Sequence, residues 1–235
     1  MAQATIGPFS QTASTAGSGA LPRVAMLPIY GNLADFLHAI GDIKPSRVLL
    51  NPWPGTATEK DLVEFVDRDK RLVELIDGTL VEKAVGSNES IIAGAILSAI
   101  NQFIRGRKLG VVGGEAFMAR MISGRVRMPD VSYVSFDRFP DRTFPKTPIT
   151  PMGPDLAVEV LSESNTRAEM DQKLKEYFSS GTKLAWIVDP ESESVEVYLG
   201  PEKPERIQHQ GESVDGGAVL PGLIIPLNDI FHPYE

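Results

Sequence analysis

Residues 155–162 read Asp-Leu-Ala-Val-Glu-Val-Leu-Ser, a short and nearly all-apolar run with one carboxylate inside it. A run of this length and composition is typical of a strand that other elements cover on both faces. Residues 166–180 follow with a capping box, Thr166 and Glu169, and predict a helix. Residues 184–188 form another apolar run and predict a second buried strand. Strand, helix and strand in this order imply a right-handed crossover in a partly parallel sheet.

The sequence before this unit predicts further elements of one α/β domain. Asp77-Gly78 separates two apolar runs and is the strongest hairpin signal in the chain. Residues 88–105 carry apolar side chains at the spacing of a helix with one buried stripe. We also expect helices at 33–40 and 58–66, and strands at 71–76, 79–83, 110–117, 127–136 and 195–198.

Composition divides the chain into three parts. Residues 1–22 are rich in Ala, Ser, Thr and Gly and predict a disordered N-terminal tail. We expect residues 23–54 to form an N-terminal extension and residues 55–235 to form the main domain. No apolar run reaches the roughly 20 residues that span a bilayer, and the N-terminus lacks a secretory signal. These features predict a cytoplasmic protein without a membrane segment.

Charge and cysteine content exclude several classes of function. A net charge of -8 and a pI near 5.0 argue against a protein that coats nucleic acid non-specifically. Residues 101–146 reverse this balance, with nine basic and four acidic side chains. Each arginine of this stretch reads more simply as part of a solvated face of mixed charge, and in a nuclease the stretch would contact phosphates. With no cysteine, the chain has no disulfides, thiolate metal sites or cysteine nucleophiles. His38, His209 and His232 form no spaced metal-binding pair.

Two acidic residues lie in predicted strands. Glu159 lies inside an apolar strand, where an unpaired carboxylate would cost several kcal/mol. A buried Arg or Lys would neutralise it without any catalytic role, and a metal ion would do so with one. Asp130 follows Pro129 at the start of another strand and reads equally as a strand-edge residue. If the two strands are neighbours, the carboxylates face each other closely enough to share one divalent cation.

Phosphodiester hydrolysis needs a positive group beside such a carboxylate pair to orient water and balance charge. The helix after the Glu159 strand offers Lys173 and Lys175. Its apolar arc lies closer to Lys173 than to Lys175, so helical geometry slightly favours Lys173. Either residue is equally explained as a surface lysine whose stem covers the edge of the core.

Several separated motifs together resemble a known family. They are Glu74-Leu-Ile-Asp-Gly78, Arg127-Met-Pro-Asp-Val131, residues 155–162, Glu176-Tyr-Phe and Trp186-Ile-Val-Asp-Pro190. This pattern, over about residues 55 to 232, resembles the Uma-type restriction endonuclease family, a branch of the PD-(D/E)XK nuclease superfamily. The resemblance implies an α/β (α+β) fold with an αβββαβ core and a mixed sheet flanked by helices, here with an N-terminal β-hairpin extension.

The resemblance also implies roles for individual residues. Asp130 and Glu159 match the acidic residues of the motif and would bind Mg²⁺ or Mn²⁺, with the backbone carbonyl of Val160 as a third ligand. The sequence departs from the superfamily pattern at Leu161, where the motif has lysine. In the Uma-type branch the lysine lies on the next helix, at the position of Lys173.

Three further acidic residues are candidates for the site, and their roles stay open. Glu89 matches the place where the superfamily often has an extra acidic residue, but an acidic residue near a helix start also suits the helix dipole. Glu82 and Glu115 are the other two candidates.

Two functions follow from this reading. The first is a metal-dependent endonuclease that acts on DNA through Asp130, Glu159 and Lys173, as a homodimer that suits a two-stranded substrate. The second is a catalytically inactive nuclease fold that binds DNA or a protein partner, which the acidic pI and Leu161 favour. The presence of both carboxylates favours the endonuclease, because a protein that only binds DNA or a partner has no need for Glu159 inside a buried, apolar strand.

Overall fold

Strand β8 (Leu156–Val160) lies inside a six-stranded sheet with the order β11-β10-β9-β8-β6-β3. The computed structural model describes residues 30–84 and 86–234, so the expected tail at 1–22 lies outside the described residues. The predicted crossover is confirmed, because β8 pairs in parallel with β9 and helix α4 connects them. The other elements of this unit are β3 (Gly110–Gly113), β6 (Val131–Ser135), α4 (Arg167–Ser179), β9 (Leu184–Asp189), β10 (Ser194–Tyr198) and β11 (Arg206–Gln208).

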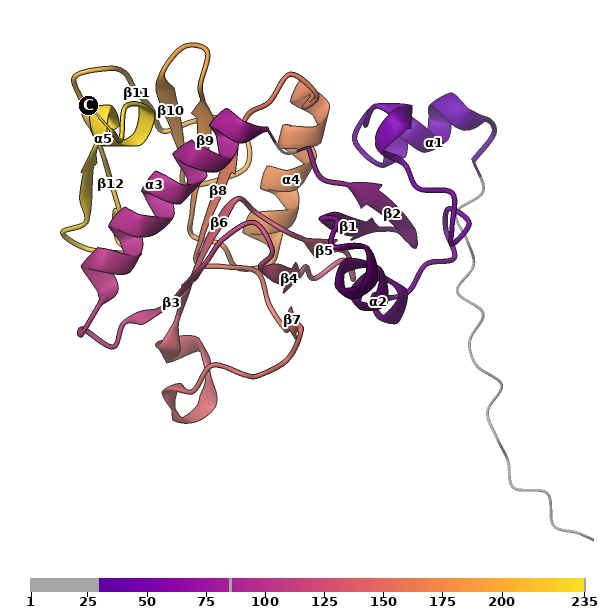
Figure 1. Ribbon diagram of the computed structural model, residues 1–235, viewed down its shortest axis with the longest axis horizontal. Coiled ribbons are helices and arrows are strands. Elements are labelled where there is room, and N and C mark those ends of the chain that lie inside the picture. Colours follow the sequence, from indigo (N-terminus) through magenta and orange to yellow (C-terminus); the bar gives the residue numbers. More distant parts are fainter. Residues whose placement is uncertain (1–29, 85, 235) are drawn as a thin grey trace, which may run out of the picture.

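Helices cover both faces of this sheet (Figure 1). Helix α3 (Ser87–Ile104) packs its isoleucines on one face, against Val158 and Val160 of β8. Helix α4 packs on the other face, against Ala157 and its neighbours in β9. Because side chains alternate along a strand, Glu159 points to the α4 side with Ala157. In chain order α3, β3, β6, β8, α4 and β9 form the expected αβββαβ core.

A second sheet of five strands lies beside the first, with the order β2-β1-β5-β4-β7 (Figure 1). Its strands are β1 (Val73–Ile76), β2 (Thr79–Glu82), β4 (Met118–Arg120), β5 (Val126–Arg127) and β7 (Ile149–Thr150). Asp77 and Gly78 both have positive φ, as the tight turn of the β1–β2 hairpin requires. The expectation of a hairpin extension needs correction, because β1 also pairs with β5 and the hairpin is part of this sheet.

The predicted strand at 110–117 is shorter than expected, and the predicted strand at 127–136 is divided between the two sheets. The first run ends as β3 at Gly113, and the chain turns before β4. The second run passes from β5 to β6 through Met128 and Pro129. Pro129 has no N–H to donate to a ladder, so it suits the crossing between the sheets. Asp130 therefore stands directly before β6.

Helix starts follow the predicted capping residues, with one difference. Thr58 and Asp61 form a complete capping box at α2 (Glu59–Asp69). At α4 the Thr166 hydroxyl accepts a hydrogen bond from the backbone N–H of Glu169 at 3.0 Å. The Glu169 carboxylate binds Arg47 instead of the backbone N–H of Thr166, so the second hydrogen bond of a capping box is not made. The remaining elements are α1 (Leu33–Ala39), β12 (Ser213–Asp215), β13 (Ile224–Pro226), α5 (Leu227–Phe231) and 3-10 turns at Pro45–Arg47, Phe136–Arg138 and Pro140–Arg142. Within the described part of the chain, no helix combines the length and the apolar character that a membrane crossing requires.

Candidate active site

Asp130 and Glu159 face each other across two neighbouring strands. Strands β6 and β8 are antiparallel, with Val131 opposite Val158, so the next pair in this register is Asp130 and Glu159. Directly opposite residues share one face of a sheet. Both side chains lie on the α4 side, and both are buried, with 8% of Asp130 and 4% of Glu159 exposed. The structure thus brings together the two carboxylates that the sequence singled out.

Helix α4 supplies the groups that hold Glu159. The ammonium of Lys173 lies 2.8 Å from Glu159 Oε2, and the Tyr177 hydroxyl donates to Oε1. Lys173 is buried, whereas Lys175 is exposed on the same helix. The lysine beside the carboxylate pair is therefore Lys173, as helical geometry favoured, and Leu161 leaves no cation in the strand itself.

Burial and mutual repulsion shape the electrostatics of the pair. Burial raises the pKa of Glu159, and the nearby charge of Asp130 raises it further, while Lys173 opposes both effects. Burial alone would lower the pKa of Lys173, but Glu159 and Glu74 raise it above its usual range. Lys173 is therefore a permanent ammonium between these two carboxylates, 3.6 Å from Glu74 Oε1.

A second lysine, Lys83, holds Asp130. It follows β2, and its ammonium lies 2.7 Å from Asp130 Oδ1 and donates to the Met128 carbonyl at 2.7 Å. The backbone N–H of Val160 donates to Asp130 Oδ2 at 2.7 Å. The sequence placed Lys83 at a strand end and gave no reason to assign it a role, because its partners come from a distant segment.

A buried ion network fixes the pair from behind. Arg127 is fully buried and contacts Glu74 at 2.8 Å and Glu176 at 2.6 Å. Glu74 also accepts from the N–H of Met128 at 2.9 Å, which anchors the segment that leads to Asp130. Burial alone would raise the pKa of Glu74, but Lys173, Arg127 and the Met128 N–H together lower it to about 2. Arg125 extends the network by contacting Glu176.

The donor set fits a hard divalent cation such as Mg²⁺ or Mn²⁺. Asp130 and Glu159 supply the carboxylate oxygens that such ions prefer. The N–H and C=O of one strand residue point toward the same neighbouring strand, so the Val160 carbonyl points to the side where its N–H meets Asp130. No group of three or more His, Cys, Asp or Glu side chains suited to a metal ion occurs in residues 30–84 and 86–234. Backbone and water oxygens would therefore complete the coordination.

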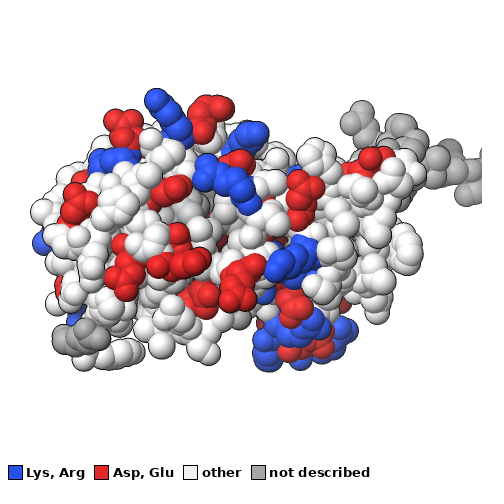
Figure 2. All heavy atoms as spheres, turned by 90° about the horizontal axis from the view of Figure 1, so that it is seen from above, with Lys and Arg blue, Asp and Glu red and all other residues white. Residues whose placement is uncertain are grey.

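A polar groove of about 560 Å³ gives access to this region. It lies where the N-terminal ends of α3 and α4 meet the end of β2, at the top of Figure 1. Its charged lining residues are Lys44, Arg47, Glu82, Lys83, Glu89 and Glu163. Figure 2 shows that the face seen from above mixes acidic and basic side chains without a continuous basic band.

The further acidic candidates have other positions. Glu82 makes two hydrogen bonds to Arg71, at 2.9 and 2.6 Å. Glu89 lies over the α3 N-terminus, where its Oε2 would be 1.9 Å from a Cβ at Gly86. Glu115 lies in the turn between β3 and β4. Only Glu82 and Glu89 line the groove, and no described contact joins any of the three to Asp130 or Glu159.

The expectation that residues 101–146 contact phosphates stays a prediction, and the ion pairs of this stretch bear on it. Most arginines of this stretch bind acidic groups of the protein itself, including Arg120 with Glu59 at 2.6 Å. Others are Arg125, Arg127, Arg138 and Arg142. The exposed Arg105, Arg107 and Lys108 lie at the C-terminal end of α3, away from the groove at its N-terminal end. The paired arginines therefore hold acidic groups within the fold, and the residues that would contact DNA stay a prediction.

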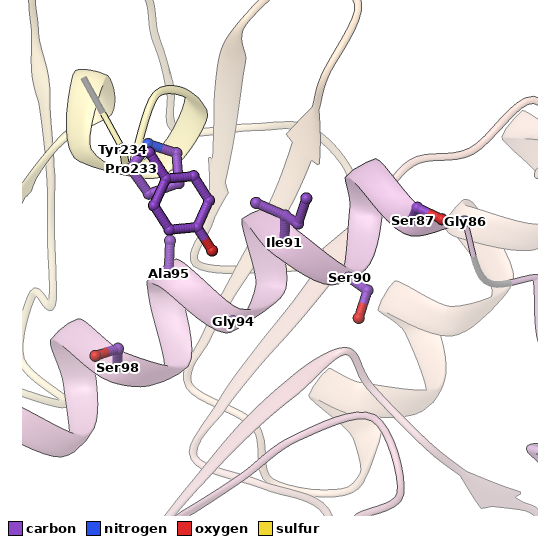
Figure 3. A pocket seen from close by; sticks show the side chains of 9 residues that line it. All are labelled: Gly86, Ser87, Ser90, Ile91, Gly94, Ala95, Ser98, Pro233 and Tyr234. Carbon is purple, nitrogen blue, oxygen red and sulfur yellow. The ribbon is translucent and has the colours of Figure 1, made fainter.

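A hollow of about 910 Å³ runs along the exposed side of α3 (Figure 3). Small and uncharged residues line it, with Ile91 and Tyr234 as the large side chains. It meets the polar groove at Gly86. Its lining has no charged side chain, so it offers no carboxylate or ammonium of the kind that the pair Asp130 and Glu159 and their lysines supply.

Comparisons with known proteins identify the family and the fold. Residues 60–228, well over half of the chain, match the model of the Uma2 family, described as "Putative restriction endonuclease". The fold is similar to the crystal structure at 1.96 Å of a "putative nuclease belonging to DUF820" from Anabaena variabilis, with a TM-score of 0.59 and 20% identity. That match covers 72% of this chain and 96% of the other. A search of curated proteins finds no match. The mixed α/β nuclease fold expected from the sequence is confirmed.

Proposed function

The chain belongs to the Uma2 family of restriction endonuclease-like proteins, and from this premise we propose that it is a metal-dependent endonuclease that hydrolyses phosphodiester bonds in DNA. The observation that supports the proposal most directly is the facing pair Asp130 and Glu159 with the Lys173 ammonium 2.8 Å from Glu159. Two buried carboxylates and a cation, with Asp130 contacted by a lysine that lines the polar groove, are groups that suit metal-assisted phosphodiester hydrolysis.

Each group has a chemical task in this proposal. Asp130, Glu159 and the Val160 carbonyl would hold Mg²⁺ or Mn²⁺, which supplies activation of water and charge stabilisation on the phosphate. Lys173 orients the attacking water and offsets the negative charge that develops on the phosphate oxygens. Tyr177 and Glu74 fix Glu159 and Lys173 through the contacts that they make in the core.

The second candidate function is recognition of DNA or a protein partner without catalysis. It is favoured by Leu161 in the place of the motif lysine, and by the two lysines that already neutralise both carboxylates. The two functions differ in whether the pair ever releases a lysine and accepts a metal ion. A homodimer would suit cleavage of both strands of a duplex and remains a prediction that sedimentation would test.

Plasmid nicking tests the enzyme directly. We expect the purified chain to convert supercoiled plasmid to open-circular or linear DNA with Mg²⁺ or Mn²⁺, and not with EDTA. Asp130→Asn, Glu159→Gln and Lys173→Met should each lower the rate by about 100-fold or more, because each removes a group that acts in the transition state. Lys175→Met is the matched control, because it removes an exposed lysine two residues away.

Unchanged nicking in the Asp130 and Glu159 variants would place the activity elsewhere or in a contaminant. A folded wild-type chain that binds DNA and never cleaves it with either metal would favour the recognition module. Circular dichroism of each variant separates loss of activity from loss of fold.

A further inference from the structure

Lys83 is a second buried lysine beside the carboxylate pair. The proposed hydrolysis mechanism assigns no role to it. Its side chain is 4% exposed, and its ammonium lies 2.7 Å from Asp130 Oδ1 and 2.7 Å from the Met128 carbonyl. It comes from the residue that follows β2, whereas Lys173 comes from α4, and both charges act on Glu74 and Glu159. It also lines the polar groove, so it lies between that groove and Asp130.

Both carboxylate oxygens of Asp130 already have a partner in the protein, and Lys83 is one of the two. Oδ1 accepts from the Lys83 ammonium, and Oδ2 accepts from the Val160 N–H. A divalent cation that binds Asp130 must compete with this ammonium for Oδ1 and must also overcome repulsion from it. Glu159 already has its own cation in Lys173, so neutralising that residue does not require Lys83.

The balance of buried charge strengthens this competition. Four carboxylates of the cluster, Glu74, Asp130, Glu159 and Glu176, contact four cations, Lys83, Arg125, Arg127 and Lys173, and Arg125 also contacts Asp77. A divalent cation therefore enters a site whose carboxylates already have cationic partners. Removal of Lys83 would leave the charge of Asp130 without its cation directly beside the metal position, where the low dielectric makes that charge effective.

We infer that Lys83 occupies the cation position at Asp130 in the metal-free protein and thereby sets a weak affinity for divalent metal. Lys83 acts here as a positioning residue, since it holds Asp130 and the Met128 segment in place until metal displaces its ammonium from Oδ1. The Met128 carbonyl remains available to the displaced ammonium. This inference rests on the proposed metal site at Asp130 and Glu159.

Titration with Mn²⁺ tests the inference without any measurement of cleavage. Calorimetry and the electron paramagnetic resonance signal of bound Mn²⁺ are recorded for the wild type, Lys83→Met and Lys83→Gln. Lys83→Gln keeps a hydrogen-bond donor near Asp130 and covers the case in which Lys83→Met fails to fold. Both neutral variants should bind Mn²⁺ at least about tenfold more tightly than the wild type, because a repelling charge is lost.

Two controls separate this role from a structural one. Lys83→Arg keeps the charge and should bind Mn²⁺ as weakly as the wild type. Lys60→Met removes a lysine whose side chain is 82% exposed and should leave the affinity unchanged. A merely structural Lys83 would make the neutral variants bind Mn²⁺ less tightly than the wild type, or equally.

The outcomes distinguish this inference from the proposed function. Wild-type binding that the neutral Lys83 variants leave unchanged or weaken would overturn the inference and leave the metal site in place. If the wild type binds no Mn²⁺ and Lys83→Gln binds it tightly, the result would support both the inference about Lys83 and the proposed metal site. No binding by any folded variant would overturn the metal site, and the inference with it.

Discussion

At the scale of single residues, Glu159 shows why a carboxylate survives inside a strand. It is 4% exposed, and it is held by the Lys173 ammonium and the Tyr177 hydroxyl from one helix. A buried ion pair adds little to the free energy of unfolding compared with an apolar pair of the same shape. Loss of one partner, however, leaves an uncompensated buried charge, which is strongly destabilising. Stability alone therefore does not account for the Glu159–Lys173 pair, and the proposed metal site gives it a role.

Because removing one partner costs more than replacing both, Lys173→Met should be less stable than the wild type. We expect the variant to lose about 3 to 5 kcal/mol of unfolding free energy near neutral pH, because Glu159 and Glu74 lose their shared cation. The double variant Lys173→Met, Glu159→Gln should recover part of this loss. Urea unfolding monitored by circular dichroism measures both.

The loss in Lys173→Met should also depend on pH. Burial and Asp130 already raise the pKa of Glu159 above 4.5, and removal of Lys173 raises it further. A raised carboxyl pKa lowers stability as pH rises through the folded value and has no such effect below the unfolded value. The deficit of Lys173→Met should therefore be larger at pH 8 than at pH 5. An equal deficit at both pH values would show that Glu159 is not the residue left uncompensated.

At the scale of elements, the β1–β2 hairpin brings Glu74 and Lys83 to the carboxylate pair. Its turn depends on Gly78, which has a φ of 72° and lies against another loop. A Cβ at Gly78 would lie 2.5 Å from the carbonyl oxygen of Gly55. The hairpin thus needs glycine for two independent reasons, its backbone conformation and the close approach of a second chain segment.

Gly78→Ala separates these reasons when it is compared with Gly124→Ala. Gly124 has a φ of 83° but no heavy atom within 4 Å of its Cβ position. We expect Gly124→Ala to cost about 1 kcal/mol for the left-handed backbone alone. Gly78→Ala should cost about 1 to 3 kcal/mol more because of the added overlap. Equal losses in thermal melts would mean that the Gly55 loop moves aside freely.

The local sequence predicted the individual helices and strands better than it predicted which segments contact each other. The unit β8, α4 and β9 was predictable because its strands, capping residue and crossover are contiguous. The division of residues 127–136 between two sheets was not, because Pro129 is equally compatible with the start of one strand. Lys83 was missed for a similar reason, since its contact Met128 is 45 residues away along the chain. The acidic pair and Lys173 came from motif spacing, and the fold then placed them together.

At the scale of the whole molecule, the distribution of charge limits how the proposed DNA substrate would be bound. The net charge is -8, and the arginines of the basic stretch mainly bind acidic groups of the protein. Only Lys44, Arg47 and Lys83 are basic among the residues that line the polar groove. Binding at the groove would therefore neutralise at most about three phosphates, far fewer than a protein with a broad basic surface neutralises.

The salt dependence of DNA binding should reflect this small number. For duplex DNA the slope of log K against log salt is about -0.9 for each neutralised phosphate, so we expect a slope no steeper than about -3. Lys44→Ala should make the slope shallower by about 1, because Lys44 borders the groove. The triple variant Arg105→Ala, Arg107→Ala, Lys108→Ala should leave affinity and slope unchanged, because these exposed residues lie at the far end of α3. Fluorescence anisotropy with a labelled duplex at several salt concentrations measures each slope. A slope that changes in the triple variant and not in Lys44→Ala would move the DNA-binding surface from the groove to the C-terminal end of α3.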